Sequence, residues 1–236
     1  MTINYNTSSW SKGSYEKDAL NFIGWFENPA LMKNGANLKA HFEGTSIALG
    51  YGYDLIQNRD RAKADLAKVG VTVTAKQIEL LNKAASASAA RRKGIAIELA
   101  NTGVVLPNKT AAESLFKNIR VDVYEGRLNN FLVNGGFTGT LPESGERIAL
   151  LSLVYNGRLA DRDTGVNKNN PARRTLTGIA QALQDGNRQE AWFWIRYRSN
   201  YAGTPKDEAR NKAGYTKRAY AESELFGVFD NRDSAT

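Results

Sequence analysis

The segment Trp25–Asp54, WFENPALMKNGANLKAHFEGTSIALGYGYD, decides the fold, because it joins the end of a helical pattern to a hairpin pattern. Apolar residues recur at helical spacing from Tyr15 to Glu27, which predicts a helix there. The step Asn28-Pro29 ends that helix, since the residue before a proline avoids helical geometry. Leu38 to Tyr53 then alternates as two short strands around a turn at Glu43-Gly44-Thr45. The segment therefore predicts a helix followed by a β-hairpin.

Two carboxyl groups frame this segment. Glu27 follows Trp25 and Phe26 at the predicted helix C-terminus, where both burial and the helix dipole disfavour a negative charge and raise a pKa. A neutral carboxylic acid can protonate a glycosidic oxygen, while a better solvated carboxylate such as Asp54 activates water. The pair is typical of a glycosidase. The alternative is that Glu27 is an ordinary solvent-exposed helix glutamate.

A Gly-Tyr-Gly-Tyr run lies between these acids. Glycines at alternate strand positions, here Gly50 and Gly52, leave one face without side chains, so a flat ligand can approach. A sugar ring is such a ligand, and Tyr51 or Tyr53 could stack on it. The alternative is that the glycines form a bulge or a tight bend.

The composition excludes several other hydrolase classes. The chain has no cysteine, so disulfides, thiol nucleophiles and cysteine-ligated zinc are excluded. Its single histidine, His41, cannot build a site that needs two or three histidine ligands, and no G-x-S-x-G motif accompanies it. We expect His41 to be a structural or surface residue and expect no metal and no cofactor. Acid–base chemistry is left to aspartate and glutamate.

The net charge of +8 indicates an anionic partner, although a merely solubilising surface is the alternative. Basic residues gather between Arg158 and Arg218, including Arg173, Arg174, Arg196 and Arg198. No DNA-binding motif accompanies them, so we expect no nucleic-acid partner. No run of 18 apolar residues and no apolar signal region occur, which predicts no stable membrane insertion and synthesis in a cytoplasm.

Helical patterns dominate after the hairpin, so the expected fold class is α+β and predominantly helical. A capping box at Thr110–Glu113 would open a long helix that ends near Leu132 and joins two lobes. We expect a flexible arm over residues 1–13 and one domain over 14–236, with a small lobe near 14–110 and a helical lobe near 111–236. The other predicted helices cover residues 59–69, 74–85, 87–101, 142–156, 175–185, 188–198, 205–212 and 214–228.

The order of several motifs resembles that of the tailed-phage lysozymes and the pesticin-like muramidases. Glu27 and the hairpin that closes on Gly-x-Gly come first. They are followed by Ile148–Gly157, Thr175-Leu176, Gln189–Trp192, Lys217-Arg218, Glu222 and Glu224–Phe226. The resemblance covers about residues 15–228. It implies a lysozyme-like two-lobed fold with a small hairpin lobe, a long connecting helix and an all-α lobe.

The resemblance assigns site residues one by one. Glu27 matches the catalytic glutamate, and Asp54 matches the aspartate of the pesticin-like domains. The family's threonine position is Ala48 here, which cannot hold a water. Ser46 shares the strand face of Ala48 and could substitute for it as a catalytic residue, while Glu43 is a reserve second carboxylate or an exposed turn residue. The expected substrate-binding residues are Gly50, Tyr51, Tyr53, Asn156 and Arg218.

The expected activity is hydrolysis of the β-1,4 bond between N-acetylmuramic acid and N-acetylglucosamine in peptidoglycan. The expected setting is a phage endolysin or virion-associated lysozyme that stays in the host cytoplasm until release, or is carried in a virion. A bacteriocin or secreted effector with the same activity, and a catalytically vestigial basic glycan-binding module, are the alternatives. The expected partners of the monomer are peptidoglycan and anionic envelope polymers.

Overall fold

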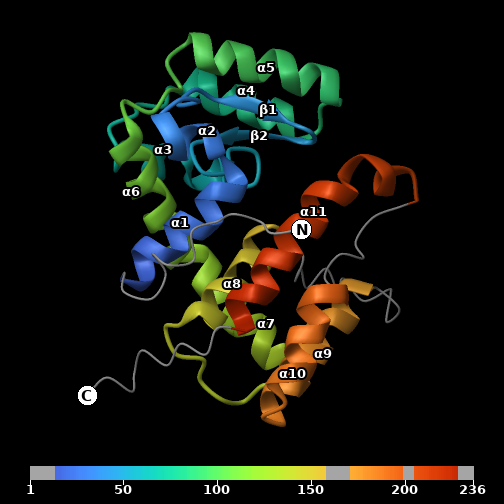
Figure 1. Ribbon diagram of the computed structural model, residues 1–236. Coiled ribbons are helices and arrows are strands. Elements are labelled where there is room, and N and C mark those ends of the chain that lie inside the picture. The colour runs from blue at the N-terminus through green and yellow to red at the C-terminus, as the bar shows by residue number, and fades with distance from the viewer. Residues whose placement is uncertain (1–13, 158–170, 199–204, 228–236) are drawn as a thin grey trace. The chain divides into compact units, whose positions relative to one another are not determined.

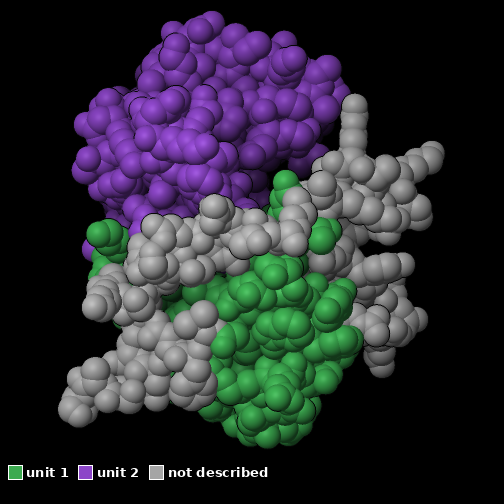
Figure 2. Space-filling view, in the orientation of Figure 1, with its two compact units in different colours: residues 1–18, 123–236 green, residues 19–122 purple. Residues whose placement is uncertain are grey.

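The computed structural model describes residues 14–157, 171–198 and 205–227 (Figure 1). The chain forms two compact units, drawn in different colours in Figure 2. We call Ala19–Asp122 the sheet unit, and Met1–Asp18 together with Val123–Thr236 the helical unit. The predicted arm over residues 1–13 lies outside the described residues.

The predicted fold class, α+β and predominantly helical, is confirmed. Helices account for most of the described residues, and the named strands form one three-stranded antiparallel sheet. The predicted lobe boundary near residue 110 differs from the observed division at Asp122. Helix α6 (Lys109–Ile119) packs against α3 (Arg59–Ala67) and the last strand, so it belongs to the sheet unit. None of the described helices is long and apolar enough to cross a membrane.

Helix α1 (Tyr15–Glu27) begins and ends as the sequence predicts. A short helix that the sequence analysis missed, α2 (Pro29–Asn34), follows directly. Asn28 caps it, since its side-chain oxygen accepts from the Leu31 N–H at 3.0 Å, and Pro29 occupies the first turn, where no donor is needed. Six residues are too few to show a helical period, which explains why the pattern did not reveal α2.

The sheet has the order β1 (His41–Glu43), β2 (Ser46–Leu49), β3 (Tyr53–Asp54). The predicted turn between the first two strands is confirmed, with Gly44 at a φ of 62°. Ala48 lies opposite His41 on one side and Asp54 on the other, and Glu43 lies opposite Ser46. Because side chains alternate along a strand, the same five residues share one face. We call this face, formed by His41, Glu43, Ser46, Ala48 and Asp54, the polar face.

The opposite face of the sheet is apolar and belongs to the core. Ile47 and Leu49 are fully buried on β2, and Tyr53 is 2% exposed on β3. Helix α5 (Ala89–Asn101) packs against β1 and β2 (Figure 1). The hairpin is therefore fixed by core packing, and on its polar face Glu43 is exposed whereas Ala48 is buried.

Two predicted helix starts in the sheet unit can be compared with the structure. Helix α4 (Ala75–Ala85) begins with the capping box of Thr74 and Gln77, at the start of the helix predicted over residues 74–85. Helix α6, however, begins at Lys109, so the predicted capping box at Thr110 is wrong. Asn108 is the cap, since its side-chain oxygen accepts from the Ala111 N–H at 2.9 Å.

The chain runs as a π-helical turn, η2 (Arg120–Glu125), where a continuous helix to Leu132 was predicted. The helical unit then contains α7 (Gly126–Asn134), α8 (Gly145–Tyr155), α9 (Pro171–Gln184), α10 (Arg188–Phe193), the π-helix η3 (Trp194–Arg198) and α11 (Pro205–Gly227). The two predicted helices over 205–212 and 214–228 are thus one helix. The apolar α8 is buried along its length and packs against α11.

Candidate active site

The C-terminal turn of α1 positions Glu27 next to the hairpin. On the same helix, a Cβ added to Gly24 would lie 3.1 Å from the Tyr51 ring, so helix and hairpin are in close contact. Asn28 Nδ2 donates to the Gly50 carbonyl at 3.0 Å. Residues three and four apart share a helix face. Glu27, three residues after Gly24, therefore lies on the side of α1 that meets the hairpin.

The pKa of Glu43 depends on the charges of Glu27 and Asp54. Burial of its carboxyl is the largest cause that raises its pKa, although the residue as a whole is exposed. The negative charges of Glu27 and Asp54 raise this pKa further, and His41 lowers it. Such effects require charges in the same region. Glu27, Glu43 and Asp54 therefore lie in one region, with Glu43 and Asp54 on the polar face; we call these three residues the carboxyl cluster.

Asp54 is held rigidly at the end of β3. Its Oδ1 accepts hydrogen bonds from the backbone N–H groups of Ile56 at 2.9 Å and Gln57 at 2.8 Å. Its Oδ2 accepts no hydrogen bond from the described residues. These two hydrogen bonds fix the orientation of the Asp54 carboxylate.

Ser46 and Ala48 occupy β2 on the polar face. Ala48 is 4% exposed, and its methyl group offers no hydrogen bond between His41 and Asp54. The Ser46 Oγ is shielded from solvent and has no hydrogen-bond partner within the described ranges. His41 makes a local contact, with Nδ1 3.1 Å from the Lys39 carbonyl oxygen.

Arg92, which the sequence analysis did not consider, fixes the hairpin turn. From α5 its guanidinium donates to the Thr45 carbonyl, to the Ala84 carbonyl at 2.8 Å and to the Ala85 carbonyl at 2.9 Å. These bonds tie the loop between β1 and β2 to the end of α4. No pattern in the sequence points to Arg92, because its partners are backbone atoms distant in the chain.

The expected stacking of a sugar on Tyr51 or Tyr53 is wrong, since both side chains are 2% exposed. The Tyr51 ring packs edge-on against Phe116, with centroids 6.3 Å apart. Burial, and after it the charge of Glu113, raises the pKa of Tyr51 to about 12. The Tyr53 hydroxyl donates to Asp65 Oδ2 at 2.9 Å. Both tyrosines belong to the core of the sheet unit.

Gly50 also has a structural role, so its expected function as an open ligand platform is wrong. Its φ is +60°, a conformation that favours glycine, and a Cβ there would lie 3.0 Å from Leu106 Cδ1. Its carbonyl already accepts from Asn28. The glycines form the tight bend that the sequence analysis gave as the alternative.

Two of the expected substrate-binding residues, Arg218 and Asn156, lie in the helical unit, and the structure gives them different environments. Arg218 is 6% exposed, and its Nε lies 3.2 Å from Glu222 Oε1. Its Nη2 donates to the Ser152 carbonyl at 3.2 Å, and Ser152 Oγ donates to Glu222 Oε1 at 2.6 Å. The substrate-binding role of Arg218 is therefore wrong, because the residue joins α11 to α8 in the interior. Asn156 is the half-exposed C-cap residue of α8, and its role stays a prediction.

Most of the predicted basic surface lies outside the part of the chain whose side chains are described; this applies to Arg158, Arg173, Arg174 and Arg198. Arg196 is described and is engaged. Its Nη1 lies 2.6 Å from Glu224 Oε1, and its guanidinium lies over the rings of Tyr220 and Trp192.

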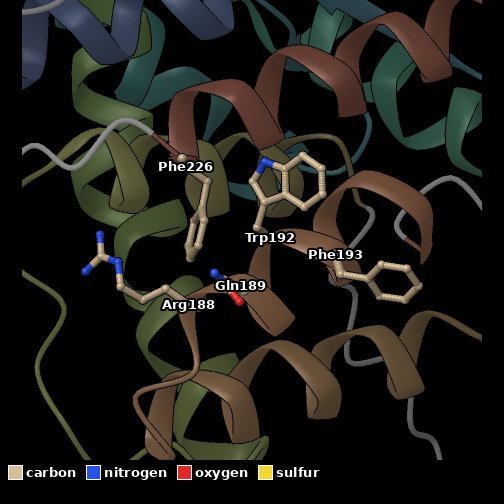
Figure 3. A pocket seen from close by; sticks show the side chains of 6 residues that line it. Arg188, Gln189, Trp192, Phe193 and Phe226 are labelled. Atoms are coloured by element: carbon tan, nitrogen blue, oxygen red, sulfur yellow. The ribbon is translucent and has the colours of Figure 1, made fainter.

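A groove of about 490 Å³ opens in the helical unit (Figure 3). Its lining includes Trp192 from α10 and Phe226 from α11, with Arg188 and Gln189 as polar members. Arg188 forms an ion pair with the buried Glu146. Trp192 is half-buried at this groove.

Among the described residues, no group of histidine, aspartate and glutamate side chains could hold a metal ion. The sequence matches no described protein family, no curated protein and no solved structure.

Proposed function

We propose that the protein is a muramidase that hydrolyses the β-1,4 bond between N-acetylmuramic acid and N-acetylglucosamine in peptidoglycan. One structural feature carries the proposal: Glu27 lies at the end of α1 on the side that meets the hairpin, and Glu43 and Asp54 share one face of that sheet, so that three carboxyl groups come into one region. Gathering like charges costs stability, so such a cluster is more typical of a site than of a scaffold.

In the proposed reaction, Glu27 acts as the general acid. It donates its proton to the glycosidic oxygen as the bond from that oxygen to C1 breaks. Asp54 removes a proton from a water whose oxygen bonds to C1, and its charge stabilises the oxocarbenium-like transition state. Atoms and charges balance between the two carboxyl groups, and no metal or cofactor is required.

The fold expected for this activity is the lysozyme-like arrangement of a hairpin lobe and a helical lobe. The sheet unit supports it, since it combines helix α1, the hairpin and a carboxyl at the end of each. We place the protein among phage endolysins or virion-associated lysozymes, with peptidoglycan and its anionic polymers as partners. A bacteriocin or secreted effector would use the same site after another route of delivery.

Ala48 favours one second candidate, a glycan-binding module that has lost catalysis. Alanine stands opposite Asp54, where a polar side chain would help to hold water. This module would bind peptidoglycan through its positive charge and release no sugar ends.

Product analysis separates these candidates. Purified peptidoglycan is incubated with the protein, and the new reducing ends are reduced with borohydride, hydrolysed and identified. The proposal predicts that muramitol derivatives accumulate. Glucosaminitol instead would indicate the other β-1,4 bond of the glycan and contradict the assignment. Sedimentation of the protein with peptidoglycan, without any new reducing end, would support the vestigial module.

A further inference from the structure

The groove of about 490 Å³ in the helical unit has no part in the proposed reaction, whose carboxyl groups belong to the sheet unit. Its volume lies within the range of about 300–1,000 Å³ that is usual for small-molecule sites. Phe226, which is 2% exposed, and the half-buried Trp192 line it together with Gln189 (Figure 3). Aromatic side chains with a few polar groups are the usual lining of such sites. The groove is therefore a candidate ligand site.

Two polar groups at the groove can bind a ligand. Trp192 Nε1 makes no hydrogen bond within the described part of the chain, and it is not sealed from solvent. The amide of Gln189, an exposed residue of α10, likewise has no hydrogen-bond partner among the described residues. An indole N–H can only donate a hydrogen bond, whereas an amide can both donate and accept. Together they fit a ligand that carries hydroxyl and amide groups.

Neighbouring side chains hold the Trp192 ring in one orientation. The Arg196 guanidinium lies 5.1 Å from the centre of the ring, and Tyr197 packs edge-on against it with centroids 6.1 Å apart. Gly227 borders the indole without a side chain, since a Cβ added there would lie 3.5 Å from Nε1. An aromatic surface that is already fixed loses little conformational freedom when a ligand binds.

The charges beside the groove favour a neutral ligand over an anionic one. Arg188 forms an ion pair with the buried Glu146, and Arg196 forms one with Glu224. A guanidinium that already has a carboxylate beside it attracts a further anion only weakly, because the two charges nearly cancel at a distance. An uncharged molecule with hydrogen-bonding groups therefore fits this groove better than a phosphate or an acidic polymer.

We propose that the groove is a second glycan-binding site, which takes an N-acetylglucosamine residue of the peptidoglycan strand. The inference deepens the proposed muramidase function and rests on it for the identity of the glycan. The apolar face of the sugar ring packs against the aromatic side chains. The N-acetyl carbonyl accepts a hydrogen bond from Trp192 Nε1, and a sugar hydroxyl bonds to the amide of Gln189. N-acetylglucosamine carries no charge, in agreement with the paired arginines.

A second site changes the action of the protein on a long polymer. While the groove holds one sugar of a strand, the carboxyl cluster meets other parts of the same wall at a raised effective concentration. A short fragment that occupies only one site gains nothing from this effect. The groove therefore favours attack on intact peptidoglycan over attack on small soluble fragments.

The test follows the indole N–H signals by heteronuclear NMR while an oligosaccharide of β-1,4-linked N-acetylglucosamine is added to the Glu27→Gln variant. The chain has four tryptophans, and the signal that is lost in Trp192→Phe is assigned to Trp192. This signal should move with the sugar concentration and reach saturation. Gln189→Ala should weaken the affinity about 2- to 10-fold, the effect of one lost hydrogen bond. Gly227→Leu places a side chain against the indole and should abolish the shift.

Matched controls make the same changes elsewhere in the helical unit. Gly126→Leu alters an exposed glycine at the start of α7, where an added Cβ would have nothing within 4 Å beyond its own helix. Gln181→Ala alters an exposed glutamine of α9. Both controls should bind the sugar as the parent protein does, and circular dichroism checks the fold of every variant.

A measurement of activity completes the test in the protein that retains Glu27. Gly227→Leu should release reducing ends from insoluble peptidoglycan about tenfold more slowly than the wild type, with a much smaller loss on a short soluble fragment. Equal losses on both substrates would contradict a second glycan site.

Failure of the inference and failure of the proposed function give different results. If the Trp192 signal does not move with the sugar while the wild-type protein cleaves peptidoglycan, the inference is overturned and the proposed function stands. A shift that inorganic phosphate causes and the sugar does not, or that a higher protein concentration causes alone, would assign the groove to an anion or to a second copy of the chain and would also overturn it. Sugar binding at Trp192 in a wild-type protein that releases no reducing ends would support the site and contradict the proposed function.

Discussion

At the scale of single residues, Asp54 and Glu43 differ in how the chain holds them. Asp54 is fixed by two backbone N–H groups, whereas Glu43 lies at an exposed turn with a desolvated carboxyl. A fixed carboxylate suits proton removal in the transition state.

This difference predicts unequal losses of activity. Asp54→Asn should reduce kcat about 10²–10⁴-fold, the usual range for a lost acid–base group. Glu43→Gln should cost much less, because Glu43 is not one of the two carboxyl groups that transfer protons in the proposed reaction. Lytic rates of the two purified variants, measured side by side, check the order. If Glu43→Gln is the worse of the two, Glu43 is the second catalytic carboxylate and the assignment of Asp54 is wrong.

The raised pKa of Glu43 also predicts a stability change with pH. The folded protein binds a proton at Glu43 more tightly than the unfolded chain does, so ionised Glu43 destabilises the fold. This cost is present at neutral pH and disappears as the pH falls through the folded-state pKa toward the ordinary value of 4.5. Glu43→Gln should therefore raise Tm at neutral pH, with a gain that vanishes in acid. A lower Tm for this variant at pH 7 would contradict the account.

At the scale of secondary-structure elements, the packing of α8 against α11 depends on a buried polar group. Arg218 and Glu222 lie one helical turn apart on α11, and both contact Ser152 on α8. Removing one partner of a buried ion pair leaves a charge without compensation. This group is therefore important for folding of the helical unit and not for contact with substrate.

Arg218→Ala should accordingly lower the free energy of unfolding by about 3–5 kcal/mol. The folded fraction of the variant should keep the wild-type KM, because the side chain is buried away from solvent. Urea unfolding followed by circular dichroism measures the first quantity, and steady-state kinetics measures the second. A stable variant with a strongly raised KM would restore Arg218 to the binding residues.

The sequence was sufficient for elements with a local signal. Helix α1, the hairpin turn at Gly44 and the Thr74 cap each follow from residues within a few positions of one another. The π-helical turn η2 and the burial of Tyr51 could not be predicted in this way. A π-helical turn of six residues is too short to show a period of its own. The contact of Tyr51 with Phe116 joins residues distant in the chain.

The residues of the candidate site could likewise be predicted only where the signal is local in the sequence. Period-two alternation predicts that Ser46 and Ala48 share one strand face, and the sheet confirms this. Gly50 and Tyr51 carried a pattern typical of an open ligand platform, yet α6 covers the glycine and the core encloses the ring. Alternation predicts which residues share a face but not which face another helix covers.

At the scale of the whole molecule, the net charge of +8 bears on the encounter with an anionic wall. Salt should slow lysis, because screening shortens electrostatic attraction to about 8 Å near 0.15 M ionic strength. Reversing the charges of Arg173 and Arg174 should reproduce part of this loss at low salt. Turbidity measured over a range of salt concentrations checks both expectations. Lysis that does not change from low to high salt would indicate that the charge only aids solubility.

The central claim is that Glu27 is the general acid of a glycosidase, and one comparison of lytic rates tests it most directly. Glu27→Gln keeps the size of the side chain but cannot donate the proton. Its rate of reducing-end release from peptidoglycan should fall about 10²–10⁴-fold. The matched variant Glu79→Gln, on the exposed surface of α4, should keep the wild-type rate. A folded Glu27→Gln variant that retains more than about half of the wild-type rate would contradict the account.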